Sequence, residues 1–112
     1  MDRKNTNIAT MDKTDALNIA QKYAEVIKNN FEFQKLILFG SYIKGNPHEE
    51  SDIDIAIVFS DYANRLDRQV ELMKLTRKVD SRIEPHPFRE KEFEISNPFV
   101  SEIITYGKEI RL

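Results

Sequence analysis

Residues 38–45 read LFGSYIKG and residues 51–58 read SDIDIAIV, and these two stretches say most about the chain. One apolar run ends in a Gly-Ser turn, and the next begins with Asp52 and Asp54, two residues apart. Alternate residues of a strand point to the same face roughly 6.5–7 Å apart, so we expect both carboxylates to project beside the turn. Paired acids on a strand suit a divalent cation, and a Gly-Ser turn that opens a helix suits phosphate. The pattern therefore indicates metal-assisted nucleotide chemistry.

Each half of this pattern also has a simpler interpretation. Asp52 and Asp54 could be exposed strand residues that discourage edge-to-edge pairing, and Gly40-Ser41 could be a turn that only caps a helix. Aspartate is depleted in strands, however, and two carboxylates on one face repel each other unless a cation lies between them. For Lys44, binding of phosphate and simple solvation remain equally open.

The composition is that of an ordinary globular protein, with 40% hydrophobic residues, 32% charged residues and no cysteine. A length of 112 residues suits one core, so we expect a single domain over 12–112. Residues 1–11 are polar and lack periodicity, and we expect them to form a flexible tail. No apolar run approaches the roughly 20 residues that span a bilayer, and we expect a cytoplasmic protein without a membrane partner. The net charge of −2 argues against nucleic acid as the sole partner and suits a metal-bound nucleotide better.

Hydrophobic periodicity predicts helices that alternate with strands. The predicted elements are a helix from an N-cap at Thr14 to Asn29-Asn30, a strand over 33–39, a short helix over 41–44, a strand over 52–59, a helix over 62–79, a strand over 82–86 that Pro85 and Pro87 end, a loop or short helical turn over 88–94, a helix from Asn97-Pro98 to Gly107 and a last short strand over 109–112. This order predicts an α/β (α+β) fold, with a mixed sheet of three to four strands packed with helices.

The same patterns predict which side chains are buried. In the strand over 52–59, one face should carry Ile53, Ile55, Ile57 and Phe59, and the other Asp52, Asp54, Ala56 and Val58. The residues expected to point inward from the two later helices are Leu66, Val70 and Met73, and Phe99, Val100, Ile103 and Ile104. The acids are therefore expected at one end of their strand, beyond the part of that face that other residues cover.

Gly40-Ser41, ten further residues and then Asp52-x-Asp54 resemble the signature of the DNA-polymerase-β-like nucleotidyltransferases. The chain looks like a minimal nucleotidyltransferase (MNT) domain, a family often paired with HEPN-domain proteins. Lys44-Gly45 matches the basic residue and glycine that usually follow the Gly-Ser in that family, and Ser51 matches the residue before the first acid. The order of elements agrees over nearly the whole chain, so the resemblance implies the nucleotidyltransferase fold.

The resemblance also implies a third carboxylate on a neighbouring strand. Glu84 is the candidate because alternation places it opposite the core-facing Ile83, and Asp80 at the end of the preceding helix is the alternative. Glutamate departs from the aspartate of many members, so its longer arm could reach a metal or serve only as a base. Arg82 and His86 would share the face of Glu84, where they could contact the nucleotide or acceptor, or only solvent and neighbouring side chains.

The reaction that the resemblance implies is in-line nucleotidyl transfer from ATP. Asp52 and Asp54 would hold Mg²⁺ on the triphosphate, and Glu84 with one or both aspartates would bind a second Mg²⁺ that activates the acceptor hydroxyl. The nucleotide-binding residues would be Gly40, Ser41, Lys44 and Ser51.

The resemblance finally implies a partner. In HEPN/MNT toxin–antitoxin pairs, the MNT protein moves AMP from ATP onto a tyrosine of the HEPN ribonuclease and silences it. The first hypothesis is therefore a protein adenylyltransferase that acts as an antitoxin on a HEPN-domain partner, with homo- or hetero-oligomer formation left open. Two alternatives also stay open. One is an antitoxin that occludes its partner without catalysis, and the other is the catalytic subunit of a small-molecule or RNA nucleotidyltransferase.

Overall fold

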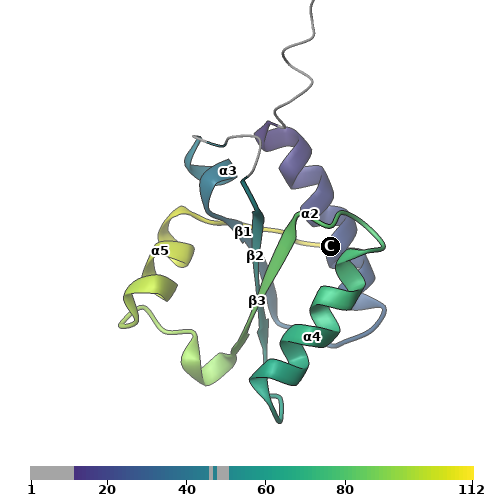
Figure 1. The fold of residues 1–112 in the computed structure, drawn as a ribbon. Helices are drawn as coiled ribbons and strands as arrows, with labels where there is room; N and C mark the ends of the chain where they lie inside the picture. Colours follow the sequence, from purple (N-terminus) through teal and green to yellow (C-terminus); the bar gives the residue numbers. More distant parts are fainter. Residues whose placement is uncertain (1–11, 46, 48–50) are drawn as a thin grey trace, which may run out of the picture.

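The structure, a computed structural model, describes residues 12–45, 47 and 51–112, and the tail predicted over 1–11 lies outside the described residues. Its elements are α2 (Lys13–Lys28), β1 (Lys35–Phe39), α3 (Ser41–Lys44), β2 (Ile53–Phe59), α4 (Arg65–Thr76), β3 (Ile83–Arg89), the 3₁₀ turn η1 (Glu90–Glu92), α5 (Pro98–Tyr106) and β4 (Lys108–Glu109) (Figure 1). The predicted alternation of helices and strands is confirmed. Within the described ranges, every helix is too short or too polar to cross a membrane.

The four strands form one mixed sheet in the order β3-β2-β1-β4. β2 pairs antiparallel with β1 and parallel with β3, and β4 adds to the outer edge of β1 in antiparallel orientation. The predicted mixed sheet is confirmed with four strands. Because β2 lies inside the sheet, the residues at its start have β1 on one side and β3 on the other.

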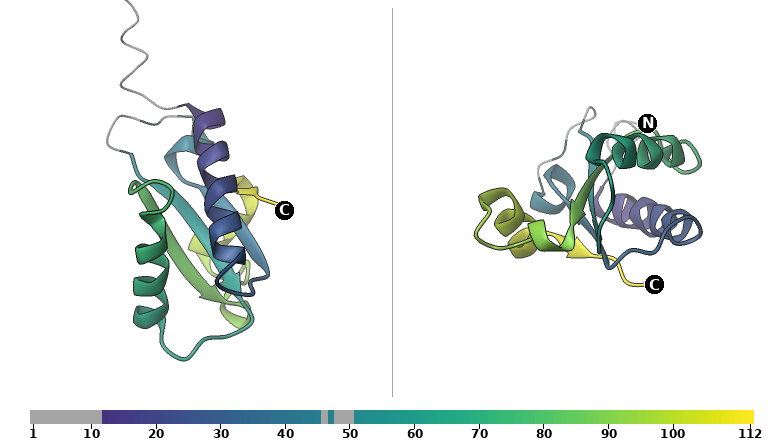
Figure 2. Two further views of the ribbon diagram at one scale, coloured as in Figure 1. Left: turned by 90° about the vertical axis from the view of Figure 1, so that its right-hand side faces the viewer. Right: turned by 90° about the horizontal axis from the view of Figure 1, so that it is seen from below.

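Helices cover both faces of this sheet, with α2 and α4 on one side and α5 on the other (Figure 2). The predicted alternation of β2 is confirmed, because Ile53, Ile55, Ile57 and Phe59 belong to the core under α2 and α4. Ala56 and Val58 belong to the smaller core on the opposite face, where Val100 and Ile103 of α5 pack. The acidic end of β2 therefore shares a face with α5.

The predicted inward face of α4 is wrong. Leu66, Val70 and Met73 are 70%, 44% and 42% exposed, whereas Leu72 is fully buried. The helix turns this way because Arg68 packs inward, with its guanidinium 4.5 Å from the centre of the Phe59 ring. Arg68 therefore packs on the core side of α4 with its aliphatic stem and guanidinium. A prediction from apolar residues alone does not consider an arginine for this position.

The N-cap of α2 and part of the buried face of α5 also differ from the prediction, whereas α5 begins at Asn97-Pro98 and ends at Gly107 as predicted. The N-cap of α2 is Asp12 rather than Thr14, and its carboxylate accepts a hydrogen bond of 2.9 Å from the backbone N–H of Asp15. An aspartate forms this cap as well as a threonine does, so composition alone does not separate them. In α5 the expected Val100 and Ile103 are buried, but Phe99 and Ile104 remain 46% and 45% exposed.

β3 continues to Arg89, and the prediction that Pro85 and Pro87 end it is wrong. β3 is an edge strand, and proline is tolerated there because its missing N–H faces away from the sheet. The carbonyls of Pro85 and Pro87 point outward too, where they accept hydrogen bonds from Gln69 Nε2 and the Tyr62 hydroxyl. The longer strand runs beside the whole of β2 and fixes the register of its polar residues.

Candidate functional site

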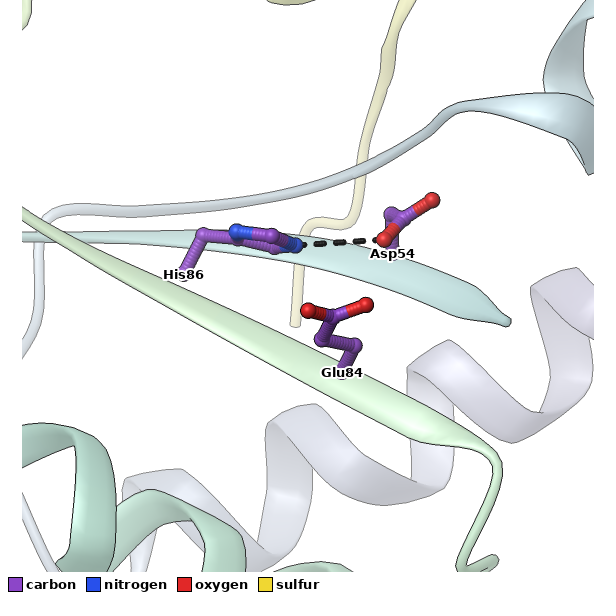
Figure 3. Close-up of side chains that lie close together, drawn as sticks. All are labelled: Asp54, Glu84 and His86. Carbon is purple, nitrogen blue, oxygen red and sulfur yellow. Dashed lines mark hydrogen bonds and ion pairs between the residues drawn. The ribbon is translucent and has the colours of Figure 1, made fainter.

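The register of β2 and β3 brings three polar side chains together at the start of β2. Asp54 pairs with Glu84, and Ala56 pairs with His86. His86 Nε2 lies 3.1 Å from Asp54 Oδ1, and one ligand atom each from Asp54, Glu84 and His86 lie within 4.8 Å of one another. Figure 3 shows the imidazole edge and the Glu84 carboxylate both directed towards Asp54. We call these three residues the acid–histidine cluster.

The Gly-Ser turn between β1 and α3 lies against this cluster. Gly40 adopts a φ of 88°, and a Cβ added to it would lie 2.5 Å from Asp54 Oδ2. Glycine is therefore required for two reasons, because L side chains rarely adopt this backbone conformation and the carboxylate fills the space. The sequence spacing placed the turn beside the aspartates, and the structure brings it into contact with Asp54.

Glu84 lies in a strongly acidic environment. Partial burial raises the pKa of the Glu84 carboxyl, and a hydrogen bond with Asp52 and the negative charges of Asp54 and Asp52 raise it further. The nearby His86 acts in the opposite direction on this pKa. Asp52 itself is exposed and precedes the first residue of β2, so it adjoins Glu84 without belonging to the acid–histidine cluster. Such crowding of carboxylates is relieved when a cation binds.

His86 is held in place by two aromatic rings. Its imidazole centroid lies 5.2 Å from that of Phe39 on β1 and 6.1 Å from that of Phe99 on α5. Sequence alternation placed His86 on the face of Glu84. Its contact with Asp54 depends on the parallel pairing of β2 and β3, for which the sequence carries no local signal.

Asp80, the alternative third carboxylate, is already paired. Arg82 binds it through Nε at 3.0 Å and through its terminal nitrogen at 2.7 Å. The hydrogen bond from Arg82 is the main cause that lowers the pKa of Asp80. The structure therefore brings Glu84 to Asp54 and leaves Asp80 and Arg82 as a pair of their own.

The remaining predicted residues lie around the turn. Ser41 is half-buried as the first residue of α3, and Ser51 is buried next to Asp52. Lys44 turns to α5, where its Nζ lies 2.7 Å from Glu102 Oε2 with both side chains about half exposed. Lys44 thus has a carboxylate partner already. His48, the other histidine of the chain, falls outside the described residues.

A surface pocket of about 660 Å³ lies at the other end of β1 and is separate from the cluster. Its lining comes from Lys28, residues 31–35 and residues 109–112. None of the predicted site residues that the structure describes lines it. The predicted site residues that the structure describes therefore lie outside this pocket.

Comparison with known proteins gives a consistent result. The profile of the family described as polymerase beta, nucleotidyltransferase matches residues 21–111. Protein adenylyltransferase MntA of Shewanella oneidensis is 30% identical over 90 residues, which cover 80% of this chain and 62% of that protein. The chain thus spans less than two thirds of the length of this relative.

Two crystal structures share the architecture. A mutant of the toxin–antitoxin MntA-HpeT has a TM-score of 0.62 and 29% identity, and the match covers 80% of this chain and 69% of that one. A toxin–antitoxin with AMP-PNP has a TM-score of 0.62 and 28% identity, with 80% and 70% covered. The fold around the acid–histidine cluster is therefore that of these nucleotidyltransferase relatives.

Proposed function

We propose that this chain, which belongs to the polymerase β nucleotidyltransferase family, is a protein adenylyltransferase that moves AMP from ATP onto a tyrosine of a toxin partner. Membership rests on the family match over residues 21–111 and confirms the resemblance seen in the sequence. The similarity to MntA, and to toxin–antitoxin structures of which one contains AMP-PNP, supports this activity. The observation that carries the proposal is the position of Asp54, which lies between the Gly-Ser turn and Glu84.

The side chains present fit a divalent cation. The space that a Gly40 Cβ would fill is occupied by a carboxylate oxygen of Asp54, and the carboxylates of Asp52 and Asp54 act on the pKa of Glu84. Asp52, Asp54 and Glu84 would hold Mg²⁺, with two ions expected. When bound, Mg²⁺ offsets the charge of the triphosphate and lowers the pKa of an acceptor hydroxyl.

The other proposed roles belong to the chain itself. Gly40 and Ser41 would position the phosphates, and Ser51 would support the chain beside Asp52. Glu84, which lies beside Asp54, would accept the proton of the tyrosine hydroxyl. The tyrosine oxygen then forms a bond to the α-phosphorus, the bond from that phosphorus to the β-phosphate oxygen breaks, and pyrophosphate leaves past the turn.

We further propose that the toxin is a HEPN-domain ribonuclease encoded beside this chain. The test is to incubate both purified proteins with Mg²⁺ and ATP labelled at the α-phosphate, and to measure label on the toxin. We expect transfer by the wild type, and a loss of about 100-fold or more in Asp52→Asn and Glu84→Gln.

Asp80→Asn is the matched control, because it removes a nearby carboxylate that lies outside the acid–histidine cluster. It should retain transfer, and circular dichroism should show that all variants are folded. Absence of label on the toxin, together with neutralisation of the toxin by the unlabelled complex, would exclude the proposed reaction and favour occlusion.

A further inference from the structure

We infer that His86 donates an imidazole nitrogen to the metal site, so that this site binds a first-row transition-metal ion more tightly than Mg²⁺. The inference rests on the proposed function, because it concerns the metal of the same site. It adds a ligand that the predicted carboxylate set of Asp52, Asp54 and Glu84 does not contain.

The first argument is the spacing of the ligand atoms. His86 Nε2 lies 3.1 Å from Asp54 Oδ1, and the ligand atoms of the acid–histidine cluster lie within 4.8 Å of one another. Nitrogen and oxygen ligands about 2.0–2.2 Å from one ion are roughly 3–4.4 Å apart, depending on whether they are adjacent or opposite. The three atoms are therefore close enough together for one ion to contact all of them after small side-chain shifts.

The second argument is that the imidazole is already aimed. Phe39 and Phe99 pack against the ring, and its strand partner in the register is Ala56, which is fully buried in the same small core as Phe39. Figure 3 shows Nε2 at the edge of the ring that faces Asp54 and Glu84. A ring held this way loses little rotational freedom when it binds an ion.

The third argument is the chemistry of the donor set. Two carboxylates alone suit Mg²⁺, which prefers oxygen ligands and keeps several waters. An imidazole nitrogen is a softer donor, which suits Zn²⁺ and other later first-row ions, whereas Mn²⁺ resembles Mg²⁺ in its preference for oxygen ligands. The same protein with His86 removed should therefore lose affinity for Zn²⁺ and keep its affinity for Mg²⁺.

The test uses the full chain in metal-free buffer without nucleotide, and Mn²⁺ as the probe. Titration followed by electron paramagnetic resonance gives the Mn²⁺ affinity, and competition gives that of Mg²⁺. The same competition gives the affinity for Zn²⁺, and we expect Zn²⁺ to bind at least about 10-fold more tightly than Mg²⁺. Pulsed measurements on the wild type should show the ¹⁴N coupling of a directly bound imidazole.

His86→Gln should abolish that coupling and weaken Zn²⁺ binding about 10-fold or more, with little change for Mg²⁺. His48→Gln changes the only other histidine of the chain and should leave the coupling unchanged. Mn²⁺ that binds the wild type without nitrogen coupling would overturn the inference and leave the proposed carboxylate site intact. This measurement needs no variant, so it does not depend on whether His86→Gln folds.

A wild-type chain that binds neither Mn²⁺ nor Mg²⁺, even with AMP-PNP present, would count against the proposed function as well.

Discussion

At Gly40 the chain has no room for a side chain, and this sets the distance between the turn and the acids. The backbone there has φ 88° and ψ −152°, and a Cβ would meet Asp54 Oδ2 at 2.5 Å. Gly45 has almost the same φ of 87° but a ψ of 14°, and apart from its chain neighbours no atom of the described residues lies within 4 Å of the position that a Cβ would take there. Both glycines therefore have a backbone requirement, and only Gly40 also needs space beside Asp54.

The first prediction compares Gly40→Ala with Gly45→Ala. Gly45→Ala should destabilise the fold through the backbone by about 1–2 kcal/mol, and the backbone cost of Gly40→Ala should be larger because its φ and ψ lie where essentially only glycine is found. Gly40→Ala should cost roughly 1–2 kcal/mol more, because it also displaces the Asp54 carboxylate. Urea unfolding measures the difference, and only Gly40→Ala should weaken metal binding. Equal losses of stability and equal metal affinities would show that the contact with Asp54 has no consequence.

The sequence was informative about single residues wherever the pattern is local. Strand alternation placed Asp54 and Glu84 on outward faces, and it put His86 on the face of Glu84. The bond between His86 and Asp54 joins residues 32 positions apart, so no local pattern predicts it. Lys44 shows the same limit, because its partner Glu102 is 58 positions away.

Among the elements, β2 was predictable because its alternation is regular, whereas β3 and α4 were not. In β3 the proline rule applies to a strand with neighbours on both sides, and the edge position of β3 removes that restriction. In α4 the choice of inward face depends on Arg68, whose aliphatic stem and guanidinium pack on Phe59. Both outcomes depend on what lies next to the element in space.

The second prediction tests the orientation of α4 with two leucines of the same helix. Leu72 is fully buried and Leu66 is 70% exposed. Leu72→Ala should lower the free energy of unfolding by about 2–4 kcal/mol, because it leaves a cavity in the core. Leu66→Ala should change it by about 0.5 kcal/mol or less. Urea unfolding checks both, and similar losses from the two variants would mean that the helix presents the other face to the core.

For the whole molecule, the site depends on segments that are far apart in the chain. The β1–α3 turn supplies Gly40, β2 supplies Asp54, β3 supplies Glu84 and His86, and Phe99 of α5 packs against the His86 ring. The fold class and the strand carrying the aspartates followed from the sequence. The assembly required the parallel register of β2 and β3, which only the folded sheet provides.

The last prediction concerns the salt bridge between Lys44 and Glu102, which connects α3 to α5. Lys44 Nζ lies 2.7 Å from Glu102 Oε2, with side-chain exposures of 45% and 49%. An exposed pair of this kind stabilises a fold by about 1 kcal/mol or less, so a phosphate group can replace the carboxylate. Glu102→Gln should therefore free Lys44 and tighten binding of Mg²⁺–AMP-PNP about 2- to 5-fold, as measured by calorimetry.

Lys44→Met should weaken the same binding, and the double variant should behave like Lys44→Met alone, because Glu102 acts only through the lysine. The gain from Glu102→Gln should shrink as salt concentration rises, since screening weakens both the salt bridge and the contact with phosphate. If Glu102→Gln tightens binding equally when Lys44 is methionine, the effect comes from general removal of negative charge. In that case Lys44 has no role in holding the nucleotide.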